Sequence, residues 1–303
     1  MRELRLLLAV AGAGNMLRAA QEAGLTQPAV SKAIAGLESA FGARLFDRDN
    51  RGVQPTPQGA IVIRHARLMF DQMRQAVEEI DSLADASGGE LRVGGTPSAS
   101  GGLLAHAIGQ LAAAHPGIRC HAAEMEASQL VAELRERRLD FGVCRAPALR
   151  PGDELEFEPL FKDRLLVVAG EQHRLARRRA LRLEDLAAED WILPPETSAV
   201  GQEIRAAFER GGLASPQARI TLMSILMRYE LLGTQRYLTV LHGSLLRLGR
   251  PPVHVRVLPV DLGAGVTVGL LRVRGRTLLP AAERLMERLR ALGKALAARK
   301  GPA

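Results

Sequence analysis

The 303-residue sequence predicts a multidomain protein with a helical N-terminal part and a larger α/β part. Two observations carry this prediction. Up to Leu83, apolar side chains recur three or four positions apart, which is helical spacing. From Glu90 onward, short apolar runs alternate with helical segments, which predicts a mostly parallel sheet flanked by helices. A glycine-containing joint, Ser87-Gly88-Gly89, separates the two patterns.

The first forty residues are predicted to form three short helices joined by tight turns. Asn15 is a good N-cap for a second helix over residues 16–23, and Gly24 supplies a left-handed stop. Thr26 caps the third helix, with Pro28 in its first turn, where a missing N–H costs nothing. Two short helices on such a turn, with a third packed behind, form a helix-turn-helix.

Turn chemistry at Asp49-Asn50-Arg51-Gly52 between two short extended pieces predicts a wing. Thr56-Pro57 then opens a long helix whose apolar or small positions alternate four and three apart. This heptad row predicts pairing with another helix, so we expect a dimer. The alternative is a core-facing helix of the same chain. The row consists of Val62, Ala66, Met69, Met73, Ala76, Ile80 and Leu83.

Composition limits the classes of partner and compartment. The net charge of +8 favours an anionic partner such as nucleic acid, although arginines spread along the chain weaken this indication. Only Cys120 and Cys144 occur, which indicates a reducing compartment. The sequence shows neither a signal peptide nor an apolar run long enough to span a bilayer. We therefore expect a cytoplasmic protein that does not contact a membrane.

The third helix carries the residues best suited to reading DNA. Opposite its apolar side it presents Gln27, Pro28, Ser31 and Lys32. An amide can bond two atoms of adenine, and hydroxyl and ammonium groups can reach bases or phosphates. From composition alone, an ordinary solvated face explains the same residues equally simply.

The run AAQEAGLTQPAVSKAIAGLESAFGARLFDRDNRGVQPTPQG closely resembles the DNA-binding signature of LysR-type transcriptional regulators. The resemblance covers residues 4–85 and implies that the third helix enters the major groove of promoter DNA. It implies that the wing, here with Arg48 and Arg51, tracks phosphates or the minor groove. The implied DNA-binding set is Thr26, Gln27, Pro28, Ser31, Lys32, Arg48 and Arg51. Met16 stands where family members mostly carry a large aromatic residue, on the packing side of the helices.

The remaining chain is similar to the family's effector domain, which resembles periplasmic binding proteins. The resemblance implies two Rossmann-like subdomains joined by two crossing strands, with a small ligand in the cleft between them. Hydroxyl-rich loops before two helices suit an anion, so we expect an organic or sugar acid. Helix capping alone also explains these hydroxyls. The candidate effector residues are Thr96, Ser98, Ser100, Ser128, Thr197 and Ser198.

One segment departs from the family pattern. Where the family commonly has a glycine-rich stretch, this chain reads LLGTQRYLTVLHGSLL, with Gln235, Arg236 and His242 replacing small residues. Either the cleft is shaped for an unusual ligand, or this rim serves packing. Arg236 could anchor a carboxylate, although a surface arginine is the more frequent outcome.

The predicted organisation is a winged helix-turn-helix at 1–58, a linker or dimerisation helix at 59–88 and an effector domain at 89–303. Within the last, one subdomain takes residues 89–162 and 266–300 and the other takes 163–265. The expected partners are promoter DNA, a small-molecule effector and further copies of the chain, as a dimer or tetramer, with RNA polymerase a further candidate. No metal or cofactor is expected, because the seven histidines are scattered and phosphate loops and nucleophile elbows are missing. A periplasmic solute-binding protein and an enzyme are the rival interpretations.

Overall fold

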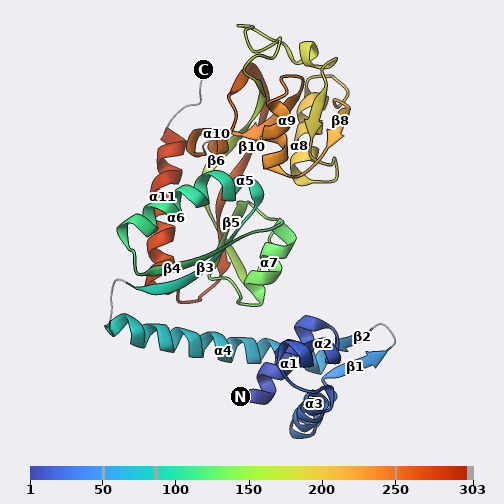
Figure 1. Cartoon of the computed structure of the whole chain (residues 1–303), viewed down its shortest axis with the longest axis vertical. Coiled ribbons are helices and arrows are strands. Elements are labelled where there is room, and N and C mark those ends of the chain that lie inside the picture. The colour runs from blue at the N-terminus through green and yellow to red at the C-terminus, as the bar shows by residue number, and fades with distance from the viewer. Residues whose placement is uncertain (50–51, 85–87, 250, 299–303) are drawn as a thin grey trace. The chain divides into compact units, whose positions relative to one another are not determined.

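The computed structural model describes residues 1–49, 52–84, 88–249 and 251–298. It divides into two compact units, Met1–Ala84 and Asp85–Ala303. The first holds short helices, a two-stranded wing and one long helix, and the second holds an eight-stranded sheet with helices on both faces (Figure 1). The predicted fold class is confirmed.

The first three helices follow one another closely, and the predicted Asn15 cap is formed at the start of the second. These are α1 (Arg2–Ala13), α2 (Met16–Glu22) and α3 (Gln27–Phe41). The Asn15 side-chain oxygen accepts hydrogen bonds from the Leu17 and Arg18 N–H groups at 2.8 and 3.2 Å. Gly24 turns the chain between α2 and α3 with φ of 64°, a backbone conformation that costs glycine little. The helices close over a core that includes Leu7, Val10, Ala19, Val30 and Ile34.

Hydrogen bonds from the wing and the residue before it hold the wing against the helices. Its strands, β1 (Phe46–Asp49) and β2 (Gly52–Pro55), pair antiparallel. The Glu38 carboxylate on α3 accepts the Leu45 N–H at 2.8 Å, and the Gly14 carbonyl accepts the Val53 N–H at 2.9 Å. The position of the wing is thereby tied to α3.

The long helix α4 (Pro57–Ala84) begins where Thr56-Pro57 predicted. The Thr56 hydroxyl donates to the Arg44 carbonyl at 2.7 Å and accepts from the Gly59 N–H at 2.9 Å. It therefore caps α4 and fastens it to the segment before the wing.

The second unit is built on one mixed sheet with strand order β4-β3-β5-β10-β6-β9-β7-β8. Its two long central strands, β6 (Leu155–Gly170) and β10 (Val255–Val273), run antiparallel and belong to both halves of the unit. These are the two predicted crossing strands. The other strands are β3 (Gly89–Gly95), β4 (Ile118–Glu124), β5 (Phe141–Arg145), β7 (Trp191–Leu193), β8 (Ala218–Thr221) and β9 (Leu238–His242).

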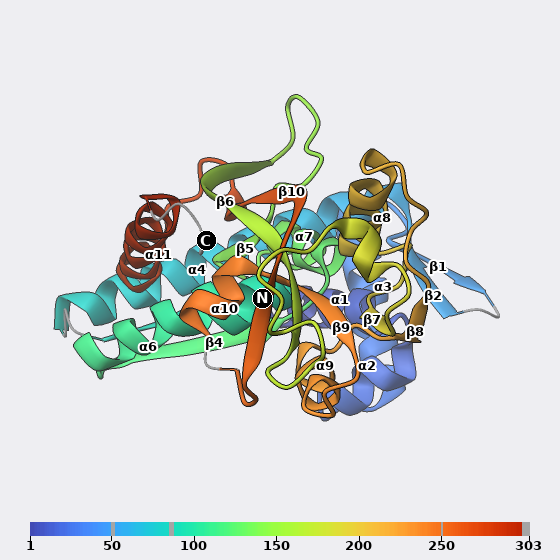
Figure 2. The ribbon, with the colours of Figure 1, turned by 90° about the horizontal axis from the view of Figure 1, so that it is seen from above.

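Helices cover both faces of the sheet in each half, as Figures 1 and 2 show. In the first half, α6 (Ala105–Ala114) and α11 (Pro280–Ala298) pack on one face and α7 (Ala127–Arg135) on the other. In the second half, α8 (Ala199–Arg210) and the 3₁₀ turn η2 (Leu183–Leu186) cover one face. Two short helices that the sequence did not indicate, α9 (Ile225–Leu232) and α10 (Gly243–Leu248), cover the other.

One predicted loop is helical instead. The segment 96–102, expected as a polar loop, forms α5 (Pro97–Ala99) and most of the π-helix η1 (Ser100–Leu104). Its two glycines suggested a loop, but they serve close packing against α10 and not a turn. A Cβ at Gly102 would lie 3.1 Å from the Leu245 Cα.

Candidate functional site

The face of α3 predicted to read DNA is open to solvent. Gln27, Pro28 and Lys32 are exposed and Ser31 is half-buried. Thr26, the N-cap, makes no capping hydrogen bond with its side chain. The opposite side of α3 packs into the core, so this helix presents amide, hydroxyl and ammonium groups from a rigid support.

The wing lies beside this helix, but its arginines are only partly described. Arg48 pairs with Val53 in the β1–β2 ladder, which fixes its backbone. Arg51 and the Arg48 side chain lie outside the described residues and atoms. For the wing, the structure therefore gives the position of the strand backbone and not that of either arginine side chain.

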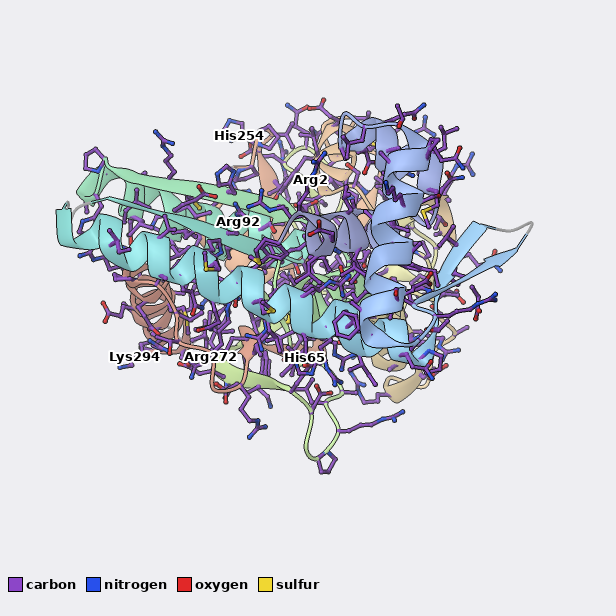
Figure 3. All side chains as sticks on the ribbon, turned by 90° about the horizontal axis from the view of Figure 1, so that it is seen from below. Arg2, His65, Arg92, His254, Arg272 and Lys294 are labelled. Atoms are coloured by element: carbon purple, nitrogen blue, oxygen red, sulfur yellow. The ribbon has the colours of Figure 1, made fainter. Side chains whose placement is uncertain are left out.

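The heptad row on α4 divides into two parts. Ala66 is buried and Val62 half-buried in the core of the first unit, so both pack within their own chain. One turn beyond His65, which Figure 3 labels on α4, the exposed part begins. This part, which we call the α4 apolar row, consists of the exposed residues Met69, Met73, Ala76 and Ile80. Leu83 lies on the helix, with its side chain outside the described atoms.

A cavity of about 600 Å³ lies between the two halves of the second unit; we call it the cleft cavity. It sits at strand ends and at the beginnings of α7 and α8. Of the six predicted effector residues, Thr96, Ser98, Ser128 and Ser198 line it. Hydroxyls from both subdomains are thus brought together.

The other two predicted residues lie elsewhere. The Ser100 side chain is buried within η1, and its Oγ would be 2.5 Å from a Cβ built at Gly95. Thr197 is exposed outside the cavity lining. Within the lining, the Ser198 hydroxyl is engaged as the cap of α8: it donates to the Pro195 carbonyl at 2.6 Å and accepts from the Gly201 N–H at 3.1 Å. Helix capping therefore explains the hydroxyl at Ser198 without a ligand.

The cleft cavity also contains three basic side chains that sequence reasoning did not place there. Arg145 at the end of β5, Arg228 on α9 and His242 at the end of β9 all line it. For His242 the sequence left two possibilities open, a cleft of unusual shape or the packing of its rim, and the structure places it in the lining. A signal for Arg145 was available, because it ends a strand whose other residues are buried. Nothing in the sequence distinguishes Arg228 from a surface arginine.

These basic residues differ in their partners. Arg145 reaches across the cleft, where it forms an ion pair with Glu203 on α8 and donates to the Ala199 carbonyl at 3.5 Å. Burial raises the pKa of the Glu203 carboxyl, and Arg145 opposes that shift. This pair spans the two subdomains.

The electrostatic environment keeps His242 neutral. Burial lowers the pKa of its imidazole, and Arg228 and Arg145 lower it further against the opposing effect of Asp163. Asp163 itself accepts the Ser244 N–H at 2.9 Å and the Ser244 hydroxyl, which fixes the start of α10. The positive charge at this end of the cavity therefore resides on the two arginines.

The other two unusual residues lie away from the cavity. Gln235 has a φ of 65°, and its side-chain oxygen accepts the Gln172 N–H at 2.8 Å. Arg236 is exposed and stacks 5.9 Å from the centre of the Tyr237 ring. Both belong to the packing of a turn and are not part of the cleft cavity lining.

The described part of the chain contains no helix long and apolar enough to cross a membrane. Within those same residues, no three histidine, cysteine or acidic side chains gather as a metal site.

Comparison with known proteins identifies both units. Residues 1–60 match the model of the bacterial regulatory helix-turn-helix protein, lysR family, and residues 84–294 match the LysR substrate binding domain. A transcriptional activation protein for SDS degradation from a Pseudomonas strain is 32% identical over 93% of each chain. The transcriptional regulator GbpR of Azospirillum brasilense is 29% identical over 96% of this chain and 86% of its own.

Solved structures share the fold. A full-length OxyR variant from Pseudomonas aeruginosa has a TM-score of 0.68 at 21% identity and covers 95% of this chain and 93% of its own. The LysR family regulator CbnR has a TM-score of 0.57 at 20% identity, covering 95% and 99%. With a matching helix-turn-helix and a matching substrate binding domain, this chain belongs to the LysR family of transcriptional regulators.

Proposed function

We propose that the regulator binds promoter DNA through α3 and the wing, and that a small organic or sugar acid in the cleft cavity modulates this binding. The observation that carries the proposal is the cavity itself. Hydroxyls of Thr96, Ser98 and Ser128 and the guanidinium of Arg228 meet in one space between two subdomains. Donors of this kind favour a carboxylate over a neutral ligand.

The DNA-binding part rests on the exposed face of α3. Gln27 and Ser31 can bond base edges, and Lys32 can bond a base or a phosphate. We expect Gln27→Ala or Ser31→Ala to weaken specific binding by about 1–3 kcal/mol per lost base contact. Lys32→Ala, if it removes a phosphate contact, also lowers the slope of log affinity against log salt by about one.

The test is a titration of the chain's own upstream DNA at several salt concentrations. Lys294→Ala is the matched control for charge, because Lys294 is exposed on α11 in the other unit and is labelled in Figure 3. Unchanged affinity and footprint in all three α3 variants would contradict the assignment of this helix.

The ligand part is tested by thermal unfolding of the full chain with a panel of small acids. An acid that binds the folded state raises the unfolding temperature. Ser98→Ala combined with Ser128→Ala should weaken that response and leave ligand-free DNA binding intact. If a stabilising acid acts equally on this double variant, these hydroxyls do not hold it.

We further propose that two copies pair along the α4 apolar row, with a tetramer formed through the second units. Unpaired apolar side chains on an exposed helix support this assembly. A twofold pair would place two α3 helices on an inverted repeat in the DNA.

A further inference from the structure

Arg228 is a buried cation without a carboxylate partner among the described residues. Only 6% of the residue is exposed, and it lines the cleft cavity. Its two terminal nitrogens donate to backbone carbonyls, those of Val240 at 3.3 Å and Met223 at 2.9 Å. Its Nε is buried without a hydrogen-bond partner. The guanidinium is therefore held in place but not neutralised.

The other two arginines of the lining do have acidic partners. Arg145 pairs with Glu203, and Arg135 pairs with Asp153 at 3.1 Å. Arg228 thus differs from them in the same cavity, which indicates that its negative partner comes from outside the chain.

The charge on Arg228 persists at neutral pH. Burial lowers the pKa of its guanidinium to about 10, and Tyr229 opposes the shift, so the group is still protonated near pH 7. A buried unpaired charge is unfavourable, and an anion that enters the cavity relieves the penalty. A carboxylate does so with charge-assisted hydrogen bonds, the strong kind.

The remaining walls indicate the rest of the ligand. Of the 26 residues that line the cavity, 17 have apolar side chains or are proline. Close to Arg228 these include Val240 and Leu241 on β9, and Val266 and Val268 come from the crossing strand β10. A sugar acid carries more hydroxyls than Thr96, Ser98 and Ser128 can pair, and those that face the apolar walls would lack partners, which is costly, whereas a hydrocarbon body gains from burial there.

We propose that Arg228 anchors the carboxylate of the effector, and that the effector is an acid with an uncharged hydrocarbon body and not a sugar acid. This inference rests on the proposed function of the cleft cavity as an acid site. It makes Arg228 the residue that determines specificity there. It also narrows the chemical class of the effector to amphipathic monocarboxylates.

The experiment measures the unfolding temperature and the dissociation constant of the full chain with three sets of probes. The first contains hydrocarbon acids (benzoate, phenylacetate, hexanoate and octanoate), the second their neutral amides, and the third gluconate and glucarate. We expect at least one hydrocarbon acid to stabilise the protein, with its amide and both sugar acids inactive.

The variants are Arg228→Met and Arg228→Lys, with Arg236→Met as the matched control because Arg236 is exposed outside the cavity. Arg228→Met removes a buried charge and keeps most of the side-chain length, so its ligand-free unfolding temperature and DNA affinity report whether it is folded. We expect binding about 10- to 100-fold weaker in Arg228→Met, an intermediate loss in Arg228→Lys and no change in Arg236→Met.

The outcomes separate the two proposals. If only sugar acids stabilise the protein, or if a hydrocarbon acid binds folded Arg228→Met as tightly as the wild type, the proposed role of Arg228 and the proposed ligand class are contradicted. Either result still agrees with an acid site in the cleft cavity. No response to any acid overturns both.

Discussion

Introducing a charge into the α4 apolar row tests whether this row is an interface. Met73 lies in its middle and leaves 56% of its surface exposed in the single chain. Burying a whole methionine side chain contributes about 1.5–3 kcal/mol, so covering roughly half of it contributes about 1 kcal/mol per copy. A twofold dimer therefore loses about 2 kcal/mol of apolar burial in Met73→Glu.

The new carboxylates add to this loss, since each must leave water or force the helices apart. With about 2 kcal/mol or more from that desolvation, the total penalty is about 4 kcal/mol, which raises the dimer dissociation constant about 10³-fold. Sedimentation velocity over a range of protein concentrations measures this change directly. Footprinting should show the protected inverted repeat shrinking towards a half-site.

The matched control is Ile61→Glu, because Ile61 is similarly exposed, at 51%, on the same helix but outside the row. It should retain the wild-type mass. If Met73→Glu keeps both the wild-type mass and normal DNA binding while its circular dichroism is unchanged, the row is not an interface.

Three further predictions concern stability. Burial lowers the pKa of His242 and of His173, so below about pH 6.5 the unfolded state binds more protons than the folded state. As the pH falls from there through the folded-state pKa, the free energy of unfolding should decrease, and it should decrease less steeply in His242→Gln. Urea titrations at pH 7.5 and 5.5 measure the difference. Arg276→Met removes the guanidinium that lies 3.1 Å from the buried Asp140 carboxylate, so the free energy of unfolding should fall by about 3–5 kcal/mol. A loss under about 1 kcal/mol would contradict this. Gly24→Ala meets no neighbouring atom, so only the left-handed backbone is strained, and calorimetry should show a loss of about 1–2 kcal/mol in the first unit.

Local rules were enough to predict where α2 and α4 begin. Asn15 and Thr56 cap helices because their side chains satisfy N–H groups only a few residues away, a relation that sequence spacing shows directly. The π-helix η1 could not be predicted in this way, because the contact that explains its glycines is not a local one. Its glycines are explained by Leu245, which is far away in the sequence and packs against them.

The site was predicted only in part for the same physical reason. Hydroxyls at strand ends could be expected near one another, because parallel strands of an α/β sheet bring their ends to one edge. Ser100 resembled Ser98 in sequence, but the helical turn directs its side chain inward. Arg228 becomes a cavity residue only through tertiary packing, so composition and periodicity could not distinguish it from the other arginines, whereas Arg145 could have been found from its place at the end of a buried strand.

The crossing strands have a consequence for the order in which the protein folds. Because the chain passes through β6 into the second subdomain and returns through β10, the first subdomain is built from two distant segments. Its core joins Leu91 and Leu111 to Leu285 and Leu289 of α11, near the C-terminal end of the chain. Contacts between such distant residues form slowly and need both segments to be present.

The first unit, in contrast, draws the described residues of its core from positions 4–66. During synthesis, the helix-turn-helix can therefore fold long before the effector domain is complete. The nascent regulator acquires the proposed DNA-reading face of α3 first and the cleft cavity last.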